Sequence, residues 1–428
     1  MSLRGLAAMC LAGTSLFFFS APLRAGATVE RSTTPNGASY IELTDDAIPT
    51  TAMELWFRVP SIGFGTAPQP GIARYAATAI AASKLGSGTS LSTRVQELGG
   101  RLSIGAYPDA VSVAVSVPAA SAPDVMKVLT DAYFSGVVTT EGMHLALRDL
   151  AIASTLKRFD PEQTLHDDVF AQLFASGPAH YPALPDDVNP LQKVKIDDLR
   201  AFVQRGFRSS NAVIAVAGGG ANLAHSVAAI SPSGTGPEQP VGSAVTSTRT
   251  PASGTFAEDG VGFGWSGPPI ADARAATAMD FISDYLFNDD TGLVTTGAGA
   301  ELFVSGQFVT LHDPGVMIVS ISGKGYDAME SRALDAIQAM QRPLDAATFA
   351  IALAAFEYRI AGDVQTPLSQ ADNFGWYAIE GNPSYAPSDA GGEYLRTAAS
   401  LDPQYVAQVA KRYLENPVVV HVKGTQPK

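Results

Sequence analysis

Cysteine is almost absent from the chain. Cys10 is the only one among 428 residues, and it lies within the first 27 residues, which have the pattern of an export signal. Removal of that segment leaves no thiol, which excludes disulfides, cysteine nucleophiles and thiolate-bound metals. Lipid attachment at Cys10 is disfavoured because Met9 stands where a small residue is needed.

Long hydrophobic runs are also missing after the N-terminus. The N-terminal segment combines Arg4, an apolar stretch from about Leu6 to Ser20 and small residues that end Ala25-Gly26-Ala27. This pattern predicts a secretory signal cleaved after Ala27, so we expect an exported, periplasmic protein. No later run reaches the roughly 18 to 20 apolar residues that a spanning helix needs, so we expect no membrane insertion.

Positive charge is scarce. The chain has 28 Lys and Arg against 41 Asp and Glu, a formal net charge of −13 at pH 7. Such a surface repels phosphate backbones, which excludes nucleic acid as a partner. A hydrophobic content of 46% and a length of 428 residues indicate a globular protein of two domains.

The chain reads as one pattern used twice. A Ser-, Thr-, Gly- and Pro-rich stretch, 231–256, lacks apolar periodicity and indicates a linker between residues 28–230 and 257–428. Both segments give strand, helix, strand, three helices and a final strand in that order. The sequence therefore predicts an α+β fold of two homologous repeats, each a mainly antiparallel sheet covered by helices on one face.

The most specific local pattern runs from Gly71 to Asp109. Gly71 precedes an Ala-rich helix, and Gly88-Thr89, Gly99-Gly100 and Asp109 follow in order. With this spacing the chain resembles the insulinase/pitrilysin family of zinc metallopeptidases, in its short-chain branch similar to mitochondrial processing peptidases. The resemblance covers nearly all of the chain after the signal.

The resemblance implies a helix that bears H-x-x-E-H, whose two His bind zinc while the Glu activates a water. The chemically needed positions of that motif hold Arg74, Ala77 and Thr78. The family's distal ligand would fall at Ile152–Ser154, which cannot bind zinc either. We therefore expect no catalytic residue, metal or cofactor in this chain, with zinc only in a partner.

A second contribution of the family is also missing. In many short-chain members a second chain supplies an Arg and, seven residues on, a Tyr that hold the substrate carbonyl. The corresponding stretch here, Thr291 to Val309, contains neither residue. The sequence therefore lacks the two side chains with which such a second chain would hold the substrate carbonyl.

The resemblance further implies that peptides add as a strand to the edge formed by residues 101–107. Main-chain hydrogen bonds are largely indifferent to side chains, so this function survives substitutions. An ordinary strand covered by its own helices is the other interpretation. The candidate peptide-binding residues are Leu102, Ser103, Ile104, Gly105 and Ala106.

Two other motifs favour structural roles. His166, Asp167 and Asp168 are adjacent, and since adjacent residues diverge around a helix, we expect a solvated helix face rather than a metal site. His180 is also expected to be structural. "GFGWSG" at 262–267 has the glycine spacing of a dinucleotide loop, but two prolines separate it from the next helix.

Three functions remain open. The leading hypothesis is an inactive subunit that pairs with a zinc-bearing relative to form a peptide-degrading or peptide-processing chamber in the periplasm. The alternative is a stand-alone peptide-binding or scaffold protein, as a monomer or a homodimer, and a third is an enzyme with an unrecognised site. For Arg74, an exposed side chain is the simpler interpretation, and pairing with an acid where the metal would lie is the other.

Overall fold

The computed structural model describes residues 29–61, 63–64, 69–157, 159–174, 185, 187–220, 222–230, 249–251 and 258–424. The predicted signal, most of the predicted linker and His180 lie outside these residues. Within them, none of the helices combines the length and apolar character needed to cross a membrane.

The first sheet has six strands in the order β1-β2-β6-β3-β5-β4. All neighbours are antiparallel except β2 and β6, which run parallel. The strands are Val29–Thr33 (β1), Ser39–Thr44 (β2), Thr50–Arg58 (β3), Arg101–Ala106 (β4), Ala110–Pro118 (β5) and Ala212–Gly218 (β6).

The second sheet repeats this plan with five strands, in the order β7-β11-β8-β10-β9 and with β7 and β11 parallel. Strand β7 lies within the range predicted as a linker, so this part of the range belongs to the sheet. The matching order confirms the predicted duplication of an α+β unit. The strands are Arg249–Pro251 (β7), Gly260–Ser266 (β8), Leu302–Val309 (β9), Val316–Gly323 (β10) and Val418–Val422 (β11).

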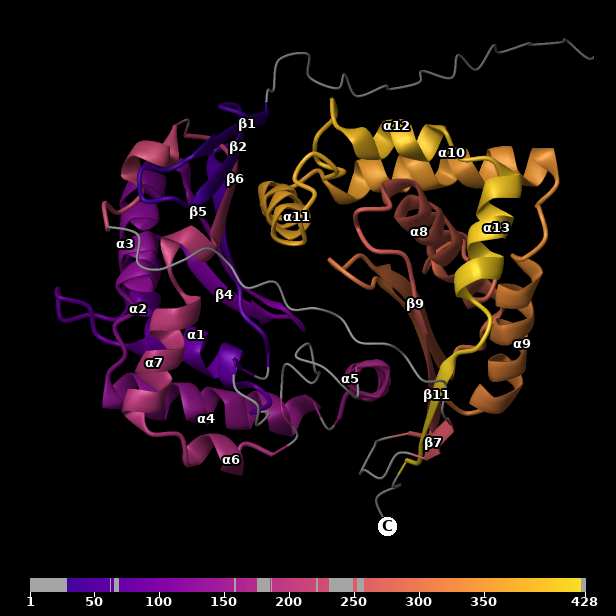
Figure 1. Cartoon of the computed structure of the whole chain (residues 1–428), viewed down its shortest axis with the longest axis horizontal. Coiled ribbons are helices and arrows are strands. Elements are labelled where there is room, and N and C mark those ends of the chain that lie inside the picture. Colours follow the sequence, from indigo (N-terminus) through magenta and orange to yellow (C-terminus); the bar gives the residue numbers. More distant parts are fainter. Residues whose placement is uncertain are drawn as a thin grey trace, which may run out of the picture.

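Helices also correspond between the halves, since in each half they follow the same strands (Figure 1). In the first half they are Ile72–Ala82 (α1), Leu91–Glu97 (α2), Ala122–Ser135 (α3), Thr140–Lys157 (α4), Pro161–Leu173 (α5), Asn189–Gln192 (α6) and Ile196–Gly206 (α7). In the second half they are Ala273–Phe287 (α8), Tyr326–Ala339 (α9), Ala346–Asp363 (α10), Pro367–Ile379 (α11), Glu393–Ala399 (α12) and Pro403–Tyr413 (α13).

Alternate residues of β3 enter two different cores. Leu55 and Phe57 pack with residues of α1 and α3, whereas Ala52 and Trp56 pack with residues of α11, from the second half. Figure 1 shows α11 beside the first sheet. The expectation of helices on one face is therefore wrong: a strand with apolar side chains on both faces needs a cover on each, and the other half supplies the second cover.

The exchange is reciprocal. Helix α5 of the first half packs on β8, β10 and β11 of the second sheet. A Cβ atom at Gly264 would overlap Val169 and Leu173 of α5, and one at Gly262 would crowd Val169. Gly262 and Gly264 of "GFGWSG" therefore lie within β8 and let α5 approach the strand closely.

Candidate functional site at α1, β4, α4 and α5

Helix α1 presents one narrow face that its own half does not bury. It begins after Gly71, whose φ of 82° is left-handed, and it buries Tyr75, Ala76 and Ala77. Arg74 and Thr78, one turn apart, are only half-buried, and the Thr78 hydroxyl donates to the Arg74 carbonyl oxygen at 2.8 Å. The two positions that hold His in the family motif thus share a face, but their side chains do not form a ligand pair.

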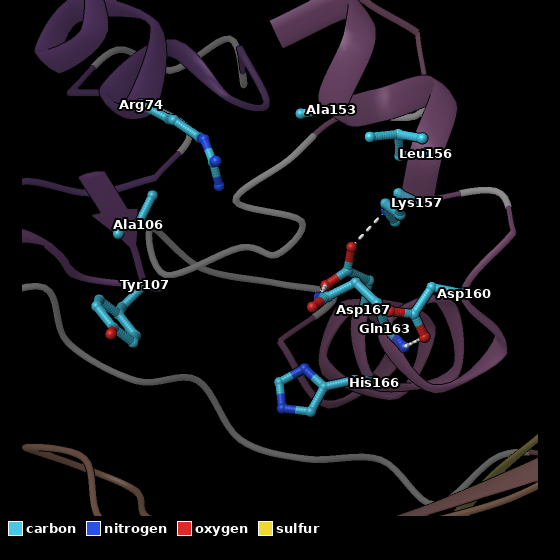
Figure 2. A pocket seen from close by; sticks show the side chains of 11 residues that line it. Arg74, Ala106, Tyr107, Ala153, Leu156, Lys157, Asp160, Gln163, His166 and Asp167 are labelled. Carbon is cyan, nitrogen blue, oxygen red and sulfur yellow. Dashed lines mark hydrogen bonds and ion pairs between the residues drawn. The ribbon is translucent and has the colours of Figure 1, made fainter. Parts of the chain in front are cut away.

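That face opens into a cavity of about 450 Å³. Its walls come from α1, the end of β4, the C-terminal end of α4 and the start of α5 (Figure 2). Ala153, in the range expected for the distal ligand, lies on the wall. The lining residues are Arg74, Gly105, Ala106, Tyr107, Ala153, Leu156, Lys157, Asp160, Gln163, His166 and Asp167.

The Arg74 guanidinium extends into this cavity (Figure 2). Its side chain is half-buried rather than exposed, which corrects the simpler expectation. Burial lowers the pKa of Arg74, although an arginine keeps its charge at neutral pH. Among the residues that the structure describes, no side chain forms a hydrogen bond or an ion pair with this guanidinium.

The wall opposite Arg74 is an ionic cluster on α4 and α5. Lys157 forms an ion pair with Asp167, and each side chain is 3% exposed. Gln163 Nε2 donates to Asp167 Oδ1 at 2.9 Å. Burial, and then the charge of Lys157, lowers the pKa of His166 to about 4, so its ring is neutral at pH 7. The expected solvated helix face is therefore wrong, because α5 is enclosed between the two halves.

Strand β4 forms the edge of the first sheet. It pairs with β5 on one side, and no strand within the described ranges pairs with its other side. Tyr107 N–H donates to Ala110 of the β5 segment. Because antiparallel residues alternate between pairing inward and outward, the backbone groups of Leu102, Ile104 and Ala106 face outward.

The predicted peptide-binding residues divide between two cavities. Gly105 and Ala106 line the cavity with Arg74, whereas Ser103, Ile104 and Gly105 line a second cavity of about 430 Å³ between β4 and α11. Leu102 lines neither and packs against the first-half core.

The second cavity is acidic. Burial, and then the nearby Asp372, raises the pKa of Glu54 to about 8. Burial raises the pKa of Asp372 to about 6. The two cavities beside β4 thus differ in charge. The first holds the Arg74 guanidinium together with the Lys157–Asp167 ion pair and the Asp160 carboxylate, whereas the second holds a carboxyl pair.

Sequence patterns alone missed the part of the first cavity that α5 supplies. Asp160, Gln163 and Asp167 become neighbours of Arg74 only because α5 crosses towards the second sheet. Asp160 followed by Pro161 signals a helix start, and Asp160 Oδ1 does accept from Gln163 N–H at 3.1 Å. No sequence signal told where that helix would dock. Throughout the described part of the chain, no three His, Cys, Asp or Glu side chains gather as a metal site.

The chain matches known proteins in fold but not in the comparisons of sequence. No known protein-family profile matches the chain, and no curated protein sequence matches it. Solved structures do match over nearly the full length of both chains.

A protease from Helicobacter pylori superposes with a TM-score of 0.77 at 13% identity, over 93% of this chain and 99% of its own. A protein named as an M16-like peptidase from Alicyclobacillus acidocaldarius gives 0.76 at 16% identity, over 94% and 100%. A peptidase M16 inactive domain from Pseudomonas fluorescens gives 0.77 at 16% identity, over 94% and 99%. The chain therefore has the two-domain fold of M16-like peptidases.

Proposed function

We propose that this chain is a non-catalytic member of the M16, or insulinase/pitrilysin, family. It binds extended peptides and pairs with a zinc-bearing relative in the periplasm, in a chamber that degrades or processes peptides. The observation that carries this proposal is the cavity beside α1. On α1 the two ligand positions of the motif hold Arg74 and Thr78 and the position of the base holds Ala77, while the range of the distal ligand, Ile152–Ser154, places Ala153 on the cavity wall, in a fold shared with M16-like peptidases.

The side chains at these positions supply neither a metal ligand nor a base. Alanine has no donor atom, and Ala77 is fully buried. The Thr78 hydroxyl is engaged by the Arg74 carbonyl. Arg74 is a cation that repels a metal ion. Peptide hydrolysis through a zinc-activated water therefore falls to a partner chain.

Peptide binding is supported by the free edge of β4. An extended peptide is able to pair with the outward N–H and C=O groups of Ile104 and Ala106. The two cavities on either side of β4 then receive alternate side chains of that peptide. Export rests on the signal pattern of residues 1–27.

The test compares the chain alone with the chain co-expressed with a zinc-bearing relative encoded beside it. We expect the chain alone to carry no zinc, to cleave no unstructured peptide and to bind such a peptide by fluorescence anisotropy. With the relative, we expect a co-purifying heterodimer that contains zinc and cleaves the peptide.

Three outcomes decide between the candidates. Zinc-dependent cleavage by the chain alone would overturn the proposal. A chain that fails to co-purify with the relative, and that light scattering shows to be a monomer or homodimer able to bind peptide, favours the stand-alone binding protein. Metal-independent cleavage by the chain alone points to an enzyme with a different site.

A further inference from the structure

Arg74 is a charge without a counterion in a partly enclosed site. The other charged groups of the cavity are already engaged. Asp167 is paired with Lys157 and accepts from Gln163, and Asp160 caps α5 through the Gln163 N–H. In the described part of the chain the Arg74 guanidinium thus has no hydrogen-bond or ion-pair partner, and the carboxylate of Asp160, although it caps α5, keeps its negative charge at the same cavity (Figure 2).

Such an arrangement is costly when the cavity is empty. Withdrawing a charge from water without a partner opposes folding, and burial does act on Arg74, since it lowers the pKa of the guanidinium. A planar guanidinium gains most from a ligand with two oxygens in one plane, because its N–H groups then donate two parallel hydrogen bonds.

We infer that Arg74 receives a carboxylate of a peptide bound along β4, an inference that rests on the proposed peptide binding. The carboxylate is either the C-terminal group of the peptide or an Asp or Glu side chain. Gly105 and Ala106, at the end of β4, share the cavity with Arg74, so a strand added at this edge delivers its groups to the guanidinium.

The second cavity, on the other side of β4, disfavours a peptide carboxylate. Glu54 and Asp372 line the second cavity, and a carboxylate there meets like charge or must take up a proton. A peptide acid therefore points towards Arg74 and away from α11. The cavity beside α1 thus selects acidic peptides or free C-termini at the position where metallopeptidases of this fold hold zinc.

The test uses three short fluorescein-labelled peptides of Ser, Val and Gly. One ends in a free carboxylate, one ends in an amide, and one ends in an amide but carries a central Glu. We expect one or both acids to bind the wild-type chain at least tenfold more tightly than the neutral amide, or about 1.4 kcal/mol. The better of the two identifies the source of the carboxylate.

Arg74→Met removes the charge but keeps an unbranched side chain, and we expect it to bind all three peptides as weakly as the neutral amide binds wild type. Arg74→Lys retains part of the preference, since a single ammonium lacks the paired donors. Arg148→Met on α4 removes an exposed arginine that does not line the cavity and is expected to behave as wild type. Urea unfolding verifies that each variant is folded.

A second measurement separates failure of this inference from failure of peptide binding. Acetylvaline and its amide are titrated against the chain while the Arg74 Nε–Hε resonance, assigned by its loss in Arg74→Met, is followed by NMR. Peptides that bind without any acid preference, or with a preference that persists in Arg74→Met, overturn the inference and leave the proposed function intact. If no peptide binds, the proposed function fails. In that case a shift of the Arg74 resonance with acetylvaline but not with its amide still supports a carboxylate site at Arg74. The absence of such a shift overturns the carboxylate site as well.

Discussion

Asp109, between β4 and β5, and Glu380, which follows α11, place two buried carboxyl groups so close that each shifts the pKa of the other. The Oδ1 atom of Asp109 and the Oε1 atom of Glu380 are both inaccessible to solvent and form no hydrogen bond to another described group, and Glu380 also accepts from the His312 N–H through its other oxygen. Two carboxyl groups in such proximity avoid repulsion when one of them is protonated and donates to the other. We therefore expect a shared proton between the two halves of the chain.

This pair makes stability depend on pH. Burial raises the pKa of Asp109, and burial together with the charge of Asp109 raises that of Glu380. A raised folded-state pKa means that the folded chain binds the proton more tightly than the unfolded chain. Its contribution is present below the unfolded pKa of about 4 and is lost as pH rises towards the folded value, at about 1.4 kcal/mol for each unit of difference.

Glu380→Gln removes this titration while its amide still donates to Asp109. We expect the free energy of unfolding of wild type to fall more steeply between pH 5 and pH 8 than that of the variant, measured by urea denaturation. Because other buried acids titrate in both proteins, the difference between the two curves isolates the pair. Glu415→Gln, at an exposed site, should follow wild type, and parallel curves for Glu380→Gln would contradict the shared proton.

The buried ion pair between Lys157 and Asp167 should respond asymmetrically to mutation. Lys157→Met leaves a buried carboxylate without its cation and is expected to cost about 3–5 kcal/mol of stability. Lys157→Met combined with Asp167→Leu removes both charges and should recover most of that loss. Chemical denaturation measures both, and a double variant as unstable as the single one would argue against a desolvated pair.

Gly375 tests the contact between α11 and β3. Alanine in a helix is normally about 0.8–1 kcal/mol better than glycine, but a Cβ atom at Gly375 would overlap the Trp56 indole. We expect Gly375→Ala to destabilise the chain by about 1–3 kcal/mol. Gly362→Ala in α10, where a Cβ meets nothing within 4 Å, is the matched control and should stabilise. Equal thermal shifts for both variants would show that α11 can move away from the sheet.

Backbone pairing at β4 can be removed one N–H at a time. Ile104→Pro deletes an outward N–H while leaving the inward pairing with β5, a position that an edge strand tolerates. One lost main-chain hydrogen bond of about 0.5–1.5 kcal/mol predicts peptide binding weaker by about two- to tenfold, measured by anisotropy. Ile104→Ala, which keeps the N–H, controls for the side chain, and its equal loss would mean that the peptide lies elsewhere.

Most of the fold could be predicted from local sequence patterns. Alternating apolar residues and capped helices give the two repeats, because such signals act over a few residues. The rest of the fold depends on contacts between residues that are far apart in the sequence. The apolar character of Ala52 and Trp56 indicates that both faces of β3 are buried, but only the assembled chain shows that α11 covers them.

The candidate site, too, could be predicted from the sequence only in part. The spacing from Gly71 to Asp109 identified the position of Arg74 as part of the candidate site, and Arg74 does line the cavity. The lack of an ion pair to Arg74 among the described residues was beyond prediction, since it depends on where α4 and α5 place the nearby acids and on the pairing of Asp167 with Lys157. Competition among neighbours for one partner cannot be read from a linear order of residues.

The reciprocal placement of α5 and α11 also sets the order in which the chain can mature. The face of the first sheet that carries Trp56 stays open to water until Pro367–Ile379 has docked, and this helix comes late in the chain. A first half that folds before the second therefore offers an apolar surface to chaperones and to other incompletely folded chains. Severing the gene between its two repeats should yield two insoluble products that recover solubility only when made together.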